Sequence, residues 1–101
     1  MTESQTLAGI LAILQAHKNA LQEKFGVLDL AIFGSYVNQQ QTPASDVDLF
    51  VDLKPEYKTF DNYMELKFFL EEQLQKKIDL SIKESIRNEL QADIFNEAVY
   101  V

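Results

Sequence analysis

The sequence predicts a small α/β (α+β) domain in which a mixed β-sheet of three or more strands packs against helices. Two segments, 46–53 and 77–82, alternate apolar and polar residues with the period of a half-buried strand. A third segment, 27–33, is almost continuously apolar, and longer segments with helical spacing flank these runs. The length of 101 residues suits one domain, 1–101, with a single modest core.

Composition excludes several classes of function. The chain has no cysteine, so disulfides and thiolate metal sites are unavailable, and the single histidine, His17, is too few for a zinc cluster. No apolar run approaches the roughly 18 residues of a membrane span. The N-terminus lacks the pattern of a secretory signal, so we expect a cytoplasmic protein without membrane contact. The net charge of −7 disfavours direct binding to nucleic acid and is compatible with a basic protein partner.

The N-terminal segment is predicted to form one long helix from about Glu3 to Phe25. Thr2 and Gln5 resemble a capping box at its start, and Gly26 suits the position just past its end. His17 interrupts the apolar face and is interpreted as an edge or surface residue rather than a ligand. The apolar face consists of residues at helical spacing, namely Leu7, Ile10, Leu11, Leu14, Leu21 and Phe25.

The first predicted strand, 27–33, suits a central position buried on both faces, and it stops at Gly34-Ser35. A short helix is expected over 36–41, and the turn chemistry of 42–45 predicts a loop. The strand 46–53 places its two sets of side chains on opposite faces. Val47, Leu49, Val51 and Leu53 form the core face, and Asp46, Asp48, Phe50 and Asp52 form the other.

The remaining elements are a helix over 59–75, the strand 77–82 and a last helix capped by Ser85. The tail 98–101 suits either a terminal strand or an interface segment. The strands 46–53 and 77–82 are joined by a helix, which permits parallel pairing. The link between 27–33 and 46–53 is short and irregular, so we expect a mixed sheet.

Three carboxylates carry the candidate chemistry. Asp46 and Asp48 project from one face of a predicted strand, with Cα atoms about 6.6 Å apart. Asp79 faces away from the apolar side of its own strand, so the three would line one patch if the two strands are neighbours. Such a patch calls for a counterion, because like charges at close range raise one another's pKa. Mg²⁺, which prefers oxygen ligands, fits this role, although a bare Asp-x-Asp is more often surface acid.

The Gly34-Ser35 turn follows an apolar strand and precedes the predicted short helix. Glycine allows a close approach of the backbone to a ligand. Backbone N–H groups at a helix start, together with the serine hydroxyl, favour an anion such as a phosphate. An ordinary strand-ending turn is the alternative, because the dipeptide alone is common.

The combined spacing is more specific than either motif. Gly34-Ser35 is followed after ten residues by Asp46-Val47-Asp48, and a third acid lies in Lys77-Ile78-Asp79-Leu80. This pattern resembles the nucleotidyltransferase superfamily related to DNA polymerase β. The short length is similar to that of the minimal nucleotidyltransferase (MNT) domains, which are often the antitoxin half of HEPN/MNT toxin–antitoxin pairs. The resemblance extends from Phe25 to the end of the chain.

The resemblance implies a site and a reaction. Asp46 and Asp48 would hold the divalent metal ions that bridge the nucleotide's phosphates, and Asp79 would complete the metal site and orient or deprotonate an attacking hydroxyl. Gly34 and Ser35 would hold the triphosphate. The implied donor is ATP, with Mg²⁺ as cofactor. The implied acceptor is a tyrosine of a HEPN ribonuclease toxin, which the transfer of AMP would silence.

One position departs from the family's pattern. The family often shows Ala-Arg-Gly after Gly-Ser-x, whereas this chain has Val37-Asn38-Gln39. Asn38, the third expected nucleotide-binding residue, can donate hydrogen bonds but carries no charge. Lys76 and Lys77 are interpreted as surface lysines.

The departure at Asn38 leaves two functions open. One is an adenylyltransferase that modifies the toxin. The other is a catalytically weak antitoxin that inhibits the toxin by binding and masking it. A small-molecule acceptor is disfavoured because no second lobe is available to enclose it. The chain could assemble as a homodimer or as a hetero-oligomer with the toxin.

Overall fold

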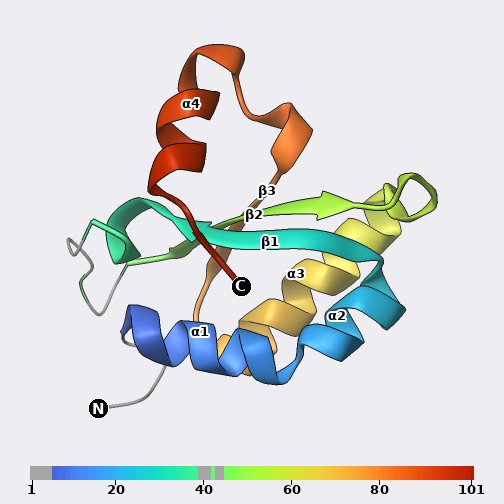
Figure 1. Ribbon diagram of the computed structural model, residues 1–101. Helices are drawn as coiled ribbons and strands as arrows, with labels where there is room; N and C mark the ends of the chain where they lie inside the picture. Colours follow the sequence, from blue (N-terminus) through green and yellow to red (C-terminus); the bar gives the residue numbers. More distant parts are fainter. Residues whose placement is uncertain (1–5, 39–41, 43–44) are drawn as a thin grey trace.

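A four-stranded sheet lies at the centre of the molecule and separates two layers of helices (Figure 1). The computed structural model describes residues 6–38, 42 and 45–101. Three helices lie against one face of the sheet, and the last helix lies against the other. The helices are α1 (Leu7–Ala16), α2 (Lys18–Phe25), α3 (Phe60–Leu74) and α4 (Asn88–Glu97), and the strands are β1 (Val27–Phe33), β2 (Val47–Leu53), β3 (Ile78–Ile82) and β4 (Val99–Tyr100). The predicted α/β class is confirmed.

The strand order is β3-β2-β1-β4, and the sheet is mixed as predicted. β1 pairs antiparallel with β2 and with β4, whereas β2 and β3, which α3 connects, are parallel. The predicted bounds of β1 agree with the structure. Those of β2 and β3 differ from it by one residue at the start, and those of α3 differ by one residue at each end. Of the two interpretations of the tail, the terminal strand is confirmed by β4.

The N-terminal helix is not continuous, so the prediction of one helix to Phe25 was wrong. His17 leaves the helical conformation with φ −105° and ψ 10°, and it separates α1 from α2. The physical reason is tertiary, because its ring packs 5.6 Å from the Phe69 ring and its Nε2 lies 2.7 Å from Gln73 Oε1 of α3. The cap of α1 is Thr6, whose hydroxyl accepts from Gly9 N at 3.0 Å. The predicted capping box lies outside the described residues.

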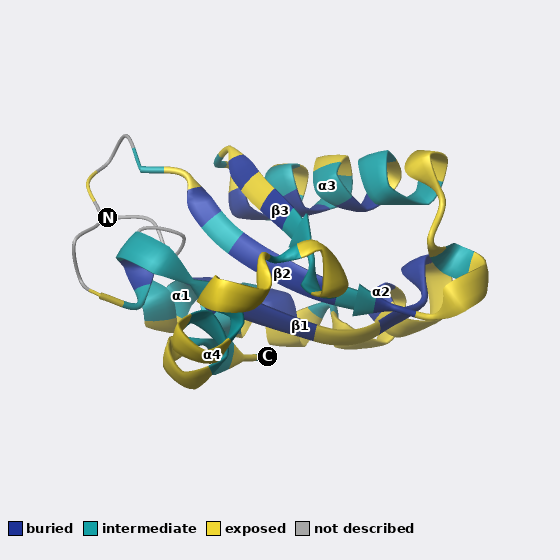
Figure 2. Ribbon diagram, turned by 90° about the horizontal axis from the view of Figure 1, so that it is seen from above, coloured by how far each residue is buried: buried dark blue, intermediate teal, exposed yellow. Residues whose placement is uncertain are grey.

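The core lies between the sheet and helices α1, α2 and α3. Figure 2 shows the inner strands largely in the colour of buried residues, whereas α4 carries exposed and intermediate positions. The helix-facing residues of β2 and β3, except the half-buried Ile82, are buried as their alternation predicted, and those of β1 are buried with them. They are Val27, Leu30, Ile32, Val47, Leu49, Val51, Leu53, Ile78 and Leu80.

β1 is buried on both faces only in its second half, which corrects the prediction for this strand. A register shift between Val27 and Asp29 interrupts the alternation, and Leu28 is 50% exposed. On the second face Phe50 is fully buried, although the sequence grouped it with three aspartates. The rings of Phe33, Phe95 and Tyr100 surround it at centroid distances of 5.8, 5.2 and 5.6 Å. This aromatic cluster attaches α4 to the sheet and packs against β4.

Ser85 does not cap the last helix, contrary to the prediction. It belongs to a short turn, Lys83–Ser85, and the chain remains extended through Ile86 before α4 begins at Asn88. The N-cap residue is Arg87, without a side-chain cap bond. These extended residues carry the chain from β3 to the second face of the sheet, so tertiary placement overrides the local capping signal.

Side chains of α3 bond to the backbone of β3, the edge strand of the sheet. Tyr63 Oη donates to the carbonyl of Leu80 at 2.5 Å, and a carboxylate oxygen of Glu71 accepts from Ile78 N at 3.2 Å. An edge strand otherwise presents free polar groups that invite pairing with another chain. These bonds hold β3 in place, together with Asp79, which it carries.

Gly26 ends α2 in the left-handed conformation with φ +69°, as its place in the sequence predicted. A Cβ at this position would overlap the Tyr57 ring. We therefore expect Gly26→Ala to lower the free energy of unfolding by about 1–2 kcal/mol or more. Urea unfolding followed by circular dichroism measures this loss. Gly9→Ala, within α1, is the control, because alanine is the better helix former; equal losses in both variants would contradict the prediction.

Candidate active site

The predicted site residues converge where β1 ends and where β2 and β3 begin. Asp48 and Asp79 are register partners on the parallel pair β2–β3, and Phe33 pairs with Asp48 from the antiparallel side. Gly34 follows Phe33 directly. The strands that carry Asp48 and Asp79 are thus neighbours in the sheet, as the predicted patch of carboxylates requires. Asp48 stands between Asp79 on one side and the Gly34 turn on the other.

The electrostatics of this site centre on Asp48. Burial raises the pKa of Asp48 above its ordinary value of 3.8, and the charges of Asp79 and Asp46 and a hydrogen bond shared with Asp79 raise it further. Asp48 is half-buried, whereas Asp46 and Asp79 are exposed. A carboxylate in this position is unfavourable without a neighbouring cation. The site therefore suits a ligand that brings positive charge.

Asp46 lies just before the first residue of β2, at the open end of the strand. Among the residues that the structure describes, no three acidic or histidine side chains gather closely enough to form a ready-made metal cage. Mg²⁺ does not require one, since it usually takes one or two carboxylates and completes its shell with waters and substrate phosphates. The paired oxygens of Asp48 and Asp79, with Asp46 nearby, fit that chemistry.

Gly34 provides the space that the Asp48 carboxylate occupies. Its φ is +76°, and a Cβ at this position would overlap Asp48 Oδ2. The turn Gly34–Tyr36 is tight, because the N–H groups of Val37 and Asn38 both donate to Gly34 O at 3.1 Å. Tyr36, only 1% exposed, anchors this turn in the core. The sequence identified the glycine but not its contact with Asp48.

The other predicted features of this region are partly described. Ser35 is half-buried in the turn, and Asn38 is exposed just after it. The short helix expected over 36–41 is instead a 3-10 turn over Gly34–Tyr36, and residues 39–41 lie outside the described residues. In the predicted loop, Ser45 N donates to Thr42 O at 2.9 Å and Thr42 N donates to Ser45 Oγ at 2.8 Å. These mutual bonds are typical of a tight turn.

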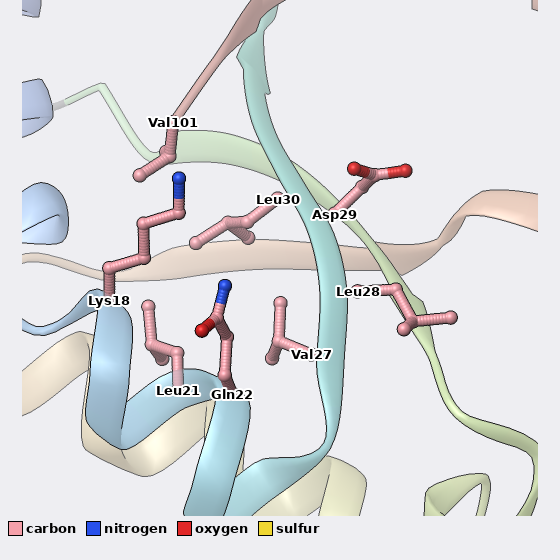
Figure 3. Close-up of a pocket in the computed structure, with 8 residues that line it drawn as sticks. All are labelled: Lys18, Leu21, Gln22, Val27, Leu28, Asp29, Leu30 and Val101. Atoms are coloured by element: carbon pink, nitrogen blue, oxygen red, sulfur yellow. The ribbon is translucent and has the colours of Figure 1, made fainter.

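A cavity of about 120 Å³ lies at the other end of β1 and is separate from this site (Figure 3). Figure 3 shows Lys18, Leu21 and Gln22 of α2 on one side and the first residues of β1 on the other, with Val101 nearby. None of the predicted site residues lines it.

Within the described residues, no helix is both long and apolar enough to cross a bilayer.

A glycine turn beside paired aspartates, at one end of a mixed sheet, suits a domain that acts on phosphate groups. The chain belongs to the nucleotidyltransferase family, since the family model described as a nucleotidyltransferase domain matches residues 14–101. The resemblance found in the sequence is confirmed, and the chain is an enzyme of the nucleotidyltransferase class.

Relatives and solved structures agree with this assignment. The chain is 40% identical over 96 residues to the protein adenylyltransferase MntA of Thermococcus cleftensis, covering 95% of this chain and 96% of the relative. A solved structure described as a minimal nucleotidyltransferase superposes with a TM-score of 0.75 at 24% identity, covering 98% of this chain and 95% of its own. A toxin–antitoxin crystal structure with AMP-PNP superposes with a TM-score of 0.67 at 20% identity. The superposition covers 85% of this chain and 70% of the chain in that structure.

Proposed function

We propose that this chain is an antitoxin that transfers AMP from ATP, with Mg²⁺, to a tyrosine hydroxyl of a HEPN-type ribonuclease toxin. The observation that carries the proposal is the pairing of Asp48 with Asp79 directly beside the Gly34 turn. The 40% identical relative named as a protein adenylyltransferase supports the reaction. The fold shared with a toxin–antitoxin structure supports the kind of partner.

Each site residue has a proposed role. Asp46 and Asp48 hold Mg²⁺, Asp79 completes the metal site, and the bound metal neutralises phosphate charge. Ser35 and the backbone of the Gly34 turn bind the phosphate chain, where a glycine allows close approach. Asn38 donates a hydrogen bond to the same anion.

The transfer itself needs a hydroxyl, a base and a leaving group. The hydroxyl oxygen forms a bond to the α-phosphorus while the bond between that phosphorus and the oxygen that bridges it to the β-phosphorus breaks. Pyrophosphate leaves with the electron pair, and the hydroxyl proton passes to the Asp79 carboxylate and then to water. Asp79 is exposed, so a side chain presented by another protein can reach it. ATP as donor agrees with the cytoplasmic setting expected from the sequence.

The partner's chemistry follows from charge. This chain carries a net charge of −7, whereas a ribonuclease needs a basic surface to hold its RNA. Opposite charges accelerate association and orient the two proteins. The acidic surface therefore favours a basic toxin as the acceptor over an RNA.

Intact mass spectrometry of the toxin tests the proposal. The proposed partner, a HEPN-type toxin, is incubated with this chain, ATP and Mg²⁺. We expect the toxin to gain the mass of one or more AMP units, and we expect chelation of Mg²⁺ by EDTA to prevent the gain. A stable, inhibited complex whose toxin gains no mass would refute transfer. Peptide mapping of the product then identifies the acceptor residue.

The second candidate function, inhibition by masking alone, is favoured by Asn38. The exposed amide at this position leaves the phosphate site without the arginine that the family often has. Masking predicts that the ribonuclease stays inhibited only while this chain remains bound. Transfer predicts that the modified toxin stays inactive after the two proteins are separated.

A further inference from the structure

Lys77 lies beside the aspartates of the candidate active site, one residue before β3 begins. Its carbonyl accepts from Val47 N at 3.0 Å, so its backbone continues the parallel ladder one residue before β3. In the register, Val47 pairs with Ile78, which places Lys77 beside Asp46. Side chains alternate along a strand, so Lys77 shares the face of Asp79 and lies opposite the buried Ile78.

The ammonium group of Lys77 is available to a ligand. Lys77 is exposed, and within the described parts of the chain no hydrogen bond, ion pair or ring contact involves its side chain. Lys83, at the far end of β3, differs from it. The Lys83 ammonium lies 4.0 Å from an Asp29 oxygen and over the rings of Phe95 and Tyr100, at 5.3 and 5.9 Å.

Two further cations that follow β2 or β3 are also engaged. Lys58 Nζ lies 2.6 Å from a carboxylate oxygen of Glu84, and Arg87 pairs with Glu89 at 2.5 Å. The site itself contributes three carboxylates, and a nucleotide triphosphate brings further negative charge. A cation that contacts the phosphates therefore has a strong electrostatic effect, and Lys77 is placed to provide it.

We infer that Lys77 binds the phosphate chain of the nucleotide and supplies the positive charge that Asn38 lacks. The inference rests on the proposed function and assigns a substrate contact within it. A lysine ammonium is a compact point charge with three donors, which suits the non-bridging oxygens of a phosphate chain. Bound there, it also stabilises the charge that the departing pyrophosphate acquires.

Charge-removal variants test this contact. Calorimetric titration with ATP and Mg²⁺ gives the affinity, and transfer assays give KM for ATP and kcat. Lys77→Ala is expected to weaken ATP binding by about tenfold or more, the scale of one charge-assisted hydrogen bond. Lys77→Arg is expected to retain most of the affinity. Lys54→Ala, which removes another exposed lysine just after the other end of β2, is the control and should bind ATP like the wild type.

A second variant tests whether charge is the cause. Asn38→Arg, introduced into Lys77→Ala, is expected to restore most of the lost affinity, because it returns a cation to the phosphate site from the Gly34 turn. If Asn38→Arg raises ATP affinity more in Lys77→Ala than in the wild type, the two positions are coupled through the charge that they supply. Thermal unfolding of each variant confirms that the fold is retained.

The outcomes separate the inference from the proposed function. If the wild type transfers AMP and Lys77→Ala binds ATP with unchanged affinity, Lys77 is only a solvated surface lysine and the inference fails alone. If the wild type binds ATP in a Lys77-dependent manner but modifies no toxin, the contact stands and the transfer function fails. A wild-type chain that binds no ATP would overturn both.

Discussion

Asp48→Asn is expected to reduce AMP transfer by a factor on the order of a thousand or more, the scale seen when a principal electrostatic group of an active site is removed. Asp48 is the central acid of the site, in register with Asp79 and in contact with the space left by Gly34. Asparagine keeps the shape of the side chain and loses the charge. The rate of AMP incorporation into the toxin, measured by mass spectrometry under single-turnover conditions, gives the ratio.

The matched control for this variant is Asp52→Asn. Asp52 lies on the same strand and the same face, four residues further along β2, where it lines a cavity with Lys83 and Phe95. Loss of this carboxylate changes the net charge equally and leaves the proposed metal site intact. A large, equal loss of transfer in both variants would indicate a general charge effect and contradict the assigned role of Asp48.

Asp48→Asn also has an expected effect on stability, and the sign of this effect is set by the raised pKa of Asp48. A carboxyl whose pKa is higher in the folded state binds its proton more tightly there, so this contribution favours folding at low pH. It is lost as the pH rises from 3.8 through the folded-state pKa, above which the ionised group opposes folding. In metal-free urea unfolding, the wild type should therefore lose more stability than Asp48→Asn over this range. Added Mg²⁺ should stabilise the wild type selectively.

Gly34→Ala is expected to reduce transfer by about a hundredfold or more while most of the fold is retained, because close placement of reacting groups contributes effects of this size. The glycine adopts φ +76°, and the new methyl group would overlap the carboxylate of Asp48. Either the turn or the acid must shift, and both lie in the proposed site. The assay is again AMP transfer, corrected for the fraction of folded protein.

Gly26→Ala separates the local effect from the strain of a left-handed residue. Gly26 has a similar φ of +69°, but its overlap would be with Tyr57, away from the aspartates. Both variants should lose stability, and only Gly34→Ala should lose transfer per folded molecule. If folded Gly34→Ala transferred AMP at the wild-type rate, this turn would not position Asp48 for the reaction.

Elements controlled by local chemistry can be predicted without the structure. Alternation with a period of two located β2 and β3 to within a residue, and the left-handed Gly26 marked the end of a helix. The spacing of the Gly34 turn and the acids indicated the family that the comparisons confirm. These signals are readable because turn preferences and side-chain periodicity act over a few neighbouring residues.

Features that depend on residues distant in the sequence become visible only in the packed fold. Contacts with Phe69 and Gln73 accompany the break at His17 in an otherwise helical pattern. The aromatic cluster buries Phe50 on a face that the sequence assigned to polar residues. Long-range packing outweighs local propensity at such positions, because buried area and specific contacts exceed the small differences between local conformations.

The site shows the same division. The sequence named three aspartates, but the register that pairs Asp48 with Asp79 depends on how the α3 crossover aligns β2 with β3. That register also places Lys77 beside Asp46, which the sequence alone did not indicate because the two are far apart along the chain. The sequence therefore identifies the residues of the site. The packing of the sheet sets their mutual placement, and this placement sets the electrostatics of the site.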